Sequence, residues 1–491
     1  MNREPNALPP VPRGQVVGPS PRKVIPLVPE GDEVDLYEVR KKVYPRAVTG
    51  WFANWRWALV FFTQLLFYGL PWLQFNGRQA LLFDLEARKF YLFGWVFWPQ
   101  DVVFLAVLLV LSALALFLFT ALAGRLFCGY ACPQTVYTEI FLWVEARIEG
   151  DRAARMKLDR RSWDSRKLAL KSAKHFAWIA ISLWTGFTFV GYFTSIVALG
   201  QSVLSLTPGP WESFWILFYA FATYGNAGWL REQVCTYMCP YARFQSVMFD
   251  RDTLIISYDP QRGDPRGKRG KSIDRRGAGL GDCIDCRICV QVCPTGIDIR
   301  DGLQYQCIGC AACIDACDQV MDKMQYPRGL IRYSTEAALA EGLDRAAIGR
   351  RILRPRVLIY GALVMVVLIA FVAGLLLRNP LKVDVIRDRG ALAREVSAGM
   401  IENVYRLQIM NTEETPRRYG IRASGLAGLK VVGIDLPLEV PSAATVSVPL
   451  RLQVEQEAGR PGSNKIEFHV ESVDRGGPAV HEKSVFFLPR P

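Results

Sequence analysis

Long uncharged apolar runs recur along the first 377 residues of the chain. Five of them lie at 57–77, 102–124, 176–199, 213–230 and 357–377, and each is close to the roughly 20 residues that a helix needs to cross a bilayer. A buried helix of a soluble protein is the alternative for any single run. Because Trp, Tyr and Arg flank these runs, as they do at membrane surfaces, the pattern predicts five transmembrane helices.

Residues 381–491 show a different pattern, in which apolar and polar positions alternate. Period-two alternation at 404–409, 445–450 and 465–470 indicates half-buried strands. Their spacing predicts an all-β immunoglobulin-like sandwich, although the paired cysteines of antibody domains are absent. We interpret His469 and His481 as ordinary strand residues rather than ligands.

Basic residues are unevenly distributed over the connections between the apolar runs. The connection 125–174 carries eleven Lys and Arg, whereas the connection between the third and fourth runs carries none. Cytoplasmic loops are enriched in Lys and Arg. We therefore expect the N-terminus, this loop and the insert 231–356 in the cytoplasm, and the residues from Arg378 onward in the periplasm.

The whole chain carries 59 Lys and Arg against 46 Asp and Glu, a net charge of +13. In a membrane protein this excess is typical of basic loops that face anionic lipid, so we expect contact with membrane lipid and none with nucleic acid. The first 30 residues contain eight prolines and no apolar run. This composition excludes a secretory signal peptide and predicts a flexible tail.

All twelve cysteines lie between residues 128 and 317, in four tight groups. Two groups, at 283–293 and 307–317, share the spacing CxxCxxCxxxC, which in bacterial ferredoxins holds two [4Fe-4S] clusters and lends each fourth cysteine to the other cluster. The predicted ligand sets are Cys283, Cys286, Cys289 and Cys317 for one cluster, and Cys307, Cys310, Cys313 and Cys293 for the other. Zinc is the alternative, but zinc sites usually join two CxxC pairs across a longer loop.

The other two groups share the pattern CxYxCP, with Cys128 and Cys132 after the second apolar run and Cys235 and Cys239 after the fourth. An arginine precedes each group, Arg125 or Arg231, which indicates a parallel duplication. In a helical turn the two thiols of a group share one face, and Pro133 and Pro240 suit the first position of a following helix.

Four converging thiolates would form a soft site for Cu(I), zinc or an iron–sulfur cluster. A disulfide is less compatible with a reducing cytoplasm, and simple packing of small side chains at helix ends is a further alternative. His175 is the only histidine near the membrane, so the chain lacks the paired axial histidines of a membrane b-type haem. This argues against a haem-based quinol oxidoreductase.

Several long segments resemble one family, the cytochrome c oxidase accessory proteins called CcoG, FixG or RdxA. The resemblance runs from about residue 51 to 334 through AGRLFCGYACPQT (123–135), FTFVGYF (187–193), AGWLREQVCTYMCPYARFQSVMFDRDTL (227–254) and GDCIDCRICVQVCPTGIDIRDGLQYQCIGCAACIDAC (281–317). A looser match, NVYRLQIMN (403–411), resembles that family's C-terminal immunoglobulin-like domain.

The resemblance implies a protein of the bacterial inner membrane that helps to mature the cbb-type oxidase, as a cupric reductase that supplies Cu(I). An unidentified cytoplasmic donor would deliver electrons to the clusters. Copper would be reduced at Cys128, Cys132, Cys235 and Cys239, and would leave for a transporter or chaperone and the oxidase assembly machinery. Two alternatives stay open: a ferredoxin-like electron conduit to quinone or a periplasmic partner, and a non-catalytic assembly factor.

The expected organisation has five parts. They are a Pro-rich cytoplasmic tail (1–50), a four-helix membrane domain with both CxxxCP motifs (51–250), a cytoplasmic ferredoxin-like domain with two [4Fe-4S] clusters (251–350), a fifth transmembrane helix (351–380) and a periplasmic immunoglobulin-like domain (381–491).

Overall fold

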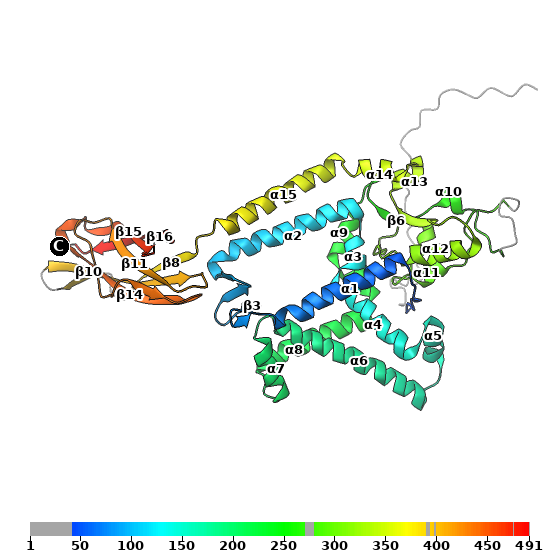
Figure 1. Cartoon of the computed structure of the whole chain (residues 1–491), viewed down its shortest axis with the longest axis horizontal. Helices are drawn as coiled ribbons and strands as arrows, with labels where there is room; N and C mark the ends of the chain where they lie inside the picture. The colour runs from blue at the N-terminus through cyan, green and yellow to red at the C-terminus, as the bar shows by residue number, and fades with distance from the viewer. Residues whose placement is uncertain (1–41, 271–278, 389–392, 397–398, 475, 491) are drawn as a thin grey trace, which may run out of the picture. The chain divides into compact units, whose positions relative to one another are not determined.

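The computed structural model describes residues 42–270, 279–388, 393–396, 399–474 and 476–490. Most of the tail predicted for residues 1–50 lies outside these ranges. The described residues from Val43 onward belong to one unit, in which helices dominate the first part of the chain and strands the last (Figure 1).

A helix occupies each of the five apolar runs. These helices are α1 (Trp51–Gly69), α2 (Val102–Ala123), α6 (Ser165–Val190), α8 (Pro210–Thr223) and α15 (Pro355–Leu376). Helix α15 packs along α2, and α6 packs along α8 (Figure 1).

Two helical segments in the described ranges are long and apolar enough to cross a membrane, Pro99–Ala123 and Pro355–Leu376. Their mean hydropathy is 3.1 and 2.7, and their most apolar stretches are 0% and 6% buried inside the protein. Such exposed apolar surface is typical of a region that contacts a membrane or a partner. The other three spans stay predictions, since α8 has only 14 residues and the first turns of α6 are rich in Lys and Arg.

The first apolar run ends earlier than predicted, because α1 stops at Gly69. Pro71 lies in the following 3-10 turn, η1 (Leu70–Trp72), and proline has no backbone N–H with which to continue an α-helix. Five short strands then separate α1 from α2. They are β1 (Gln74–Phe75), β2 (Arg78–Gln79), β3 (Leu81–Asp84), β4 (Lys89–Leu92) and β5 (Trp95–Phe97), of which the last three form one antiparallel sheet.

The third and fourth runs are also interrupted. Helix α6 ends at Val190, and α7 (Ile196–Leu204) follows a turn, so the run 176–199 is not one helix. After α8 the backbone widens into two π-helical segments, η3 (Tyr224–Leu230) and η4 (Val234–Met238). Such segments are rare and occur frequently at functional sites. The segment η3 precedes the second CxYxCP motif, and η4 contains its first four residues.

Short helices surround the cysteine groups. Those near the CxYxCP motifs are α3 (Leu126–Tyr130), α4 (Pro133–Glu149), α5 (Arg152–Arg160) and α9 (Pro240–Met248). The insert contains β6 (Ile255–Tyr258), α10 (Pro260–Gly263), α11 (Ile288–Gln291), η5 (Ile299–Asp301), α12 (Ala312–Met324), β7 (Ile331–Ser334), α13 (Glu336–Glu341) and α14 (Arg345–Arg351), with β6 antiparallel to β7.

A side chain of the insert fixes the start of α1. The carboxylate of Asp315, on α12, accepts hydrogen bonds from the backbone N–H groups of Phe52 (3.2 Å) and Ala53 (2.7 Å). The first N–H groups of a helix have no partner within the helix and attract negative charge. The carboxylate satisfies two of them and so ties the insert to the first helix.

The C-terminal strands form the predicted two-sheet sandwich. One sheet has the order β12-β14-β10-β8 with β9 beside β10, and the other has the order β13-β11-β15-β16. The strands are β8 (Leu381–Arg387), β9 (Arg394–Val396), β10 (Met400–Asn411), β11 (Arg417–Ser424), β12 (Lys430–Val432), β13 (Leu438–Val440), β14 (Thr445–Glu455), β15 (Gly462–Ser472) and β16 (Ala479–Leu488). Tyr405, Tyr419, Phe468 and Phe486 lie in the buried core between the sheets.

Candidate iron–sulfur and thiol sites

The two CxxCxxC loops have the same backbone conformation. In the first loop, Asp285 (φ 49°) and Arg287 (φ 55°) flank the second cysteine, and in the second loop Gly309 (φ 70°) and Ala311 (φ 57°) do so. A left-handed backbone conformation is uncommon for residues other than glycine. When it alternates with the right-handed conformation, successive backbone N–H groups point into one concave site, which suits anions and iron–sulfur groups. The repeat in the sequence is therefore also a repeat of a cluster-binding backbone.

Four thiols line one cavity in the insert. They belong to Cys283, Cys286, Cys289 and Cys317, so the fourth cysteine of the second group faces the first three of the first group. Cys283 and Cys289 are buried, while Cys286 is exposed at the protein surface. The ferredoxin spacing assigns these same four cysteines to one cluster.

Arg300 also lines this cavity, and sequence reasoning missed it. Its guanidinium is 4% exposed and pairs with Asp298 (2.6 Å) and Asp285 (2.7 Å). The hydrogen bond to Asp298 raises the pKa of Arg300 above its usual range. The cation therefore faces the thiols at all ordinary pH values, and nearby charge is one of the factors that set the potential of an iron–sulfur site.

The remaining four cysteines of the insert are deeply buried or partly buried. Burial raises the pKa of Cys313, and the neighbouring thiols Cys310, Cys307, Cys293 and Cys289 raise it further, so these thiols lie within electrostatic range of Cys313. Burial likewise raises the pKa of Cys307 to about 12. Bound metal ions reverse this effect, because a coordinating thiol is deprotonated outright. Two sets of four thiols in this chemistry fit two [4Fe-4S] clusters.

The CxYxCP motifs have the local structure that the sequence predicts. Cys132 and Cys239 are extended N-cap residues, and Pro133 and Pro240 are the first residues of α4 and α9, where a missing N–H costs nothing. None of the twelve cysteines forms a disulfide. Among the described residues, no group of three or more His, Cys, Asp or Glu side chains is placed so that it could hold a single metal ion.

The sequence pattern pairs Arg125 with Arg231 as the duplicated residue before each motif, but the structure does not. The backbones of Gly124 (φ 54°, ψ −119°) and Arg231 (φ 43°, ψ −112°) correspond, and each residue precedes the first cysteine of its motif by four positions. Arg125 therefore corresponds to Glu232. Glycine adopts this conformation without a Cβ clash, whereas Arg231 must be held in it by its surroundings.

The structure brings the four CxYxCP thiols toward one another and toward the insert. Cys128 and Cys235 pack against a buried cluster that includes Cys310. Burial raises the pKa of Cys235 to about 11, with further contributions from Cys132 and Cys239. The Cys128 thiol donates to Oε1 of Gln245, 3.3 Å away.

The first CxYxCP loop and the second CxxCxxC loop are in direct contact. A Cβ atom on Gly129 would lie 2.8 Å from both Cα and N of Cys310, closer than real Cβ contacts allow, so only glycine fits there. The guanidinium of Arg125, 5% exposed, donates to the carbonyl oxygens of Tyr305 and Ala242. The first CxYxCP loop is therefore docked directly on the second CxxCxxC loop.

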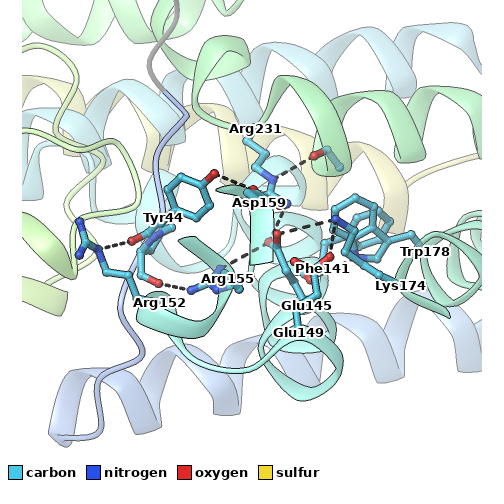
Figure 2. Close-up of polar contacts among 12 residues, drawn as sticks. Tyr44, Phe141, Glu145, Glu149, Arg152, Arg155, Asp159, Lys174, Trp178 and Arg231 are labelled. Atoms are coloured by element: carbon cyan, nitrogen blue, oxygen red, sulfur yellow. Dashed lines mark hydrogen bonds and ion pairs between the residues drawn. The ribbon is translucent and has the colours of Figure 1, made fainter. Parts of the chain in front are cut away.

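A network of buried ions holds Arg231 in its unusual conformation (Figure 2). Glu145, fully buried on α4, pairs with Arg231 at 2.8 Å and with Arg155 at 3.4 Å. Arg231 also donates to the carbonyl of Gly228 and lies over the ring of Trp178. Burial alone would raise the pKa of Glu145, but the surrounding cations outweigh it and hold that pKa below its usual value.

We expect Glu145→Gln to lower the free energy of unfolding by about 3 kcal/mol, because removing one partner leaves buried charge uncompensated. Thermal unfolding in detergent measures the change. Glu341→Gln is the matched control, since Glu341 pairs with Arg351 at an exposed position and its loss should hardly change the midpoint. Equal effects of the two substitutions would contradict the prediction.

Comparisons with known proteins give the family. A 4Fe-4S dicluster domain matches residues 230–336, a 4Fe-4S binding domain matches residues 105–150, and an IG-like fold at the C-terminus of FixG matches residues 371–489. The chain is 40% identical over 458 residues to protein RdxA of Cereibacter sphaeroides, covering 90% of this chain and 96% of RdxA. It is 38% identical over 492 residues to the nitrogen fixation protein FixG of Rhizobium meliloti, covering 92% of this chain and 93% of FixG.

A solved structure also matches. The crystal structure of a FixG-related protein from Vibrio parahaemolyticus aligns with 23% of this chain and 100% of that chain, at 21% identity and a TM-score of 0.21. Together, the two iron–sulfur domain matches cover both CxxCxxC groups and both CxYxCP motifs.

Proposed function

Because this chain belongs to the FixG/RdxA family of iron–sulfur proteins, we propose that it is a membrane electron-transfer protein that reduces Cu(II) to Cu(I) for maturation of a cbb-type oxidase. One observation carries the proposal: the loop of Cys310 lies directly against Gly129, Cys128 and Cys235. This contact joins the ferredoxin-like insert to four further thiols.

The cysteines of the insert hold the cofactors in this proposal. Their sets are Cys283, Cys286, Cys289 and Cys317, and Cys307, Cys310, Cys313 and Cys293. When bound, two [4Fe-4S] clusters supply one-electron transfer. The exposed Cys286 gives an external cytoplasmic donor access to the first set, while the second set faces the CxYxCP thiols. The ligand sets thus form an ordered path from the surface to the four thiols.

Copper is the substrate of the proposed reaction. Each Cu(II) ion takes up one electron and becomes Cu(I), and the thiolates of Cys128, Cys132, Cys235 and Cys239 favour the softer reduced ion. Reduced copper then passes to a transporter or chaperone and to the oxidase assembly machinery. In this proposal the chain crosses a bacterial inner membrane five times and contacts its lipid. The N-terminus and the clusters lie in the cytoplasm, and the sandwich lies in the periplasm.

An anaerobic reaction tests this function directly. The purified full chain is reduced, the excess reductant is removed, and Cu(II) is added together with a chelator selective for Cu(I). We expect about two Cu(I) ions per chain, one for each cluster that reoxidises, with cluster reoxidation and Cu(I) formation following the same time course. Cu(I) formation without cluster reoxidation, or no Cu(I) at all, would reject the reductase.

Gly129→Ala tests the docked contact. The added methyl group overlaps the backbone of Cys310, so the two loops must separate, and displacements of about 1 Å can slow a positioned reaction up to a hundredfold. We expect Cu(II) reduction to slow at least about tenfold. Gly349→Ala, in α14 with nothing near its Cβ, is the control and should leave the rate unchanged. A normal rate in Gly129→Ala would show that this contact is not part of the path.

A second function is favoured by one specific observation. The 4Fe-4S binding domain that matches residues 105–150 includes Cys128 and Cys132. If the four CxYxCP thiols hold a further iron–sulfur cluster, the chain is an electron conduit to quinone or to a periplasmic partner. Iron analysis separates the two functions, because a conduit would contain about twelve iron atoms per chain and the proposed reductase about eight.

A further inference from the structure

The outer face of one sheet of the sandwich carries two histidines. In β15, the alternating residues Ile466, Phe468 and Val470 are buried in the core, so His469 points away from the core. His481 is exposed on the neighbouring strand β16. The antiparallel register places His469 directly opposite His481.

The two imidazole rings converge. Their Nδ1 atoms are 2.6 Å apart, and the ring planes are inclined by 72° with centroids 4.7 Å apart. A contact this short requires a proton or a cation between the two nitrogens, because two lone pairs would otherwise repel each other. Both imidazole nitrogens can act as metal ligands, and a metal ion can displace the single proton between them.

A third side chain orients the pair. Nε2 of His469 is 2.6 Å from Oγ of Ser424, on β11. If Nε2 carries the proton and donates it to the hydroxyl, Nδ1 presents its lone pair toward His481. Metal-bound histidines almost always donate their other ring N–H in this manner, which fixes the tautomer and the ring orientation.

We propose that Nδ1 of His469 and Nδ1 of His481 form a binding site for Cu(II). Divalent copper binds imidazole more tightly than the other first-row divalent ions and prefers a square-planar arrangement. Two nitrogens about 2.0 Å from one metal lie about 2.8 Å apart when they are cis in a square plane, and about 3.3 Å apart in a tetrahedron. The observed separation is closer to the square-planar value.

Water completes the coordination, since no third His, Cys, Asp or Glu in the described ranges joins the pair. An exposed site with two protein ligands exchanges its ion readily. The proposed topology places this pair in the periplasm and the CxYxCP thiols at the cytoplasmic face, so the pair is a copper site separate from the site of reduction. Copper binding by the histidine pair therefore does not rest on the proposed function.

The test uses the full chain with Cys128, Cys132, Cys235 and Cys239 replaced by alanine, so that no side chain at these positions binds or reduces the added metal. Cu(II) is titrated into the oxidised protein, and binding is followed by competition with a coloured chelator and by electron paramagnetic resonance. We expect one Cu(II) per chain with nitrogen hyperfine structure. His469→Gln and His481→Gln should each weaken binding at least about tenfold, and Ser424→Ala should weaken it less.

Lys483→Gln is the matched control, because Lys483 is exposed on the same strand two residues from His481. It should bind Cu(II) as the parent does. Unchanged affinity in the double variant His469→Gln/His481→Gln would overturn the proposal. With all cysteines restored, the same double variant should produce Cu(I) at the normal rate, because the proposed topology places the pair and the CxYxCP thiols on opposite sides of the membrane. Tight Cu(II) binding without Cu(I) production by the unmodified chain would reject only the reductase.

Discussion

Replacing Cys317 with alanine is expected to remove the same iron–sulfur cluster as replacing Cys283, although the two residues belong to different sequence groups. Both thiols line one cavity, and loss of either leaves that cluster with three ligands. Each single variant should lose about four iron atoms per chain. Alanine is the preferred replacement, because a serine hydroxyl could substitute for the thiol as a ligand.

Double variants make this test independent of spectral assignment. Cys283→Ala/Cys317→Ala should lose no more iron than either single variant, because both changes fall on one site. Cys283→Ala/Cys293→Ala should lose about eight iron atoms, because the changes fall on two sites. The reverse pattern, with additive loss in the first pair, would show that each sequence group holds its own cluster.

Thr295→Ala is the control for these variants. Its hydroxyl lies 3.2 Å from the thiol of Cys293, so the substitution perturbs the same surroundings and keeps all eight thiols. The iron content of Thr295→Ala should equal that of the unmodified chain. A large loss of iron in this variant would mean that any substitution near the cluster loops removes iron. The iron counts of the cysteine variants would then not assign ligands to either cluster.

The cluster loops could be predicted from the sequence because ligand spacing encodes them locally. Three cysteines within seven residues fix the loop, and the residues that need a left-handed backbone lie inside it, as Gly309 does. The same holds for the CxYxCP motifs, where a proline directly marks the start of each following helix. Three long strands of the sandwich, β10, β14 and β15, could be predicted in the same way, because alternation reports which face is buried.

Features that depend on distant partners could not be predicted. Glu145 and Arg231 are 86 residues apart in the sequence, and no local sequence pattern near either residue predicts their ion pair. Gly124 and Arg231 share a conformation but not a residue type, so the arginines were matched instead. The histidine pair needs the exact register of β15 on β16, which the hairpin connection sets.

The strands between α1 and α2 were missed for a different reason. Asn76-Gly77, a common turn dipeptide, and Pro71 both lie within the run 57–77, for which the apolar pattern predicts a single span. Average hydrophobicity outweighed these local signals. A proline or an Asn-Gly pair inside an apolar run indicates that the helix ends there. This local signal is better evidence for the end of the helix than the length of the run is for a full span.

Replacing Cys128, Cys132, Cys235 and Cys239 together by alanine is expected to reduce the rate of Cu(I) formation at least about a hundredfold. Changes around the direct ligands of a metal already cost 10- to 100-fold, and this variant removes the direct ligands. The insert should keep about eight iron atoms and reduce normally, since none of its predicted ligands is changed.

Thr236→Ser is the matched control, because it changes a residue inside the second motif and keeps the hydroxyl that donates to the carbonyl of Glu232. It should reduce Cu(II) at the normal rate. The iron content of the quadruple variant decides what the four thiols bind. A loss of about four iron atoms relative to the unmodified chain would show a third cluster and favour the conduit, whereas unchanged iron with abolished Cu(I) formation is the outcome that only copper-handling thiols explain.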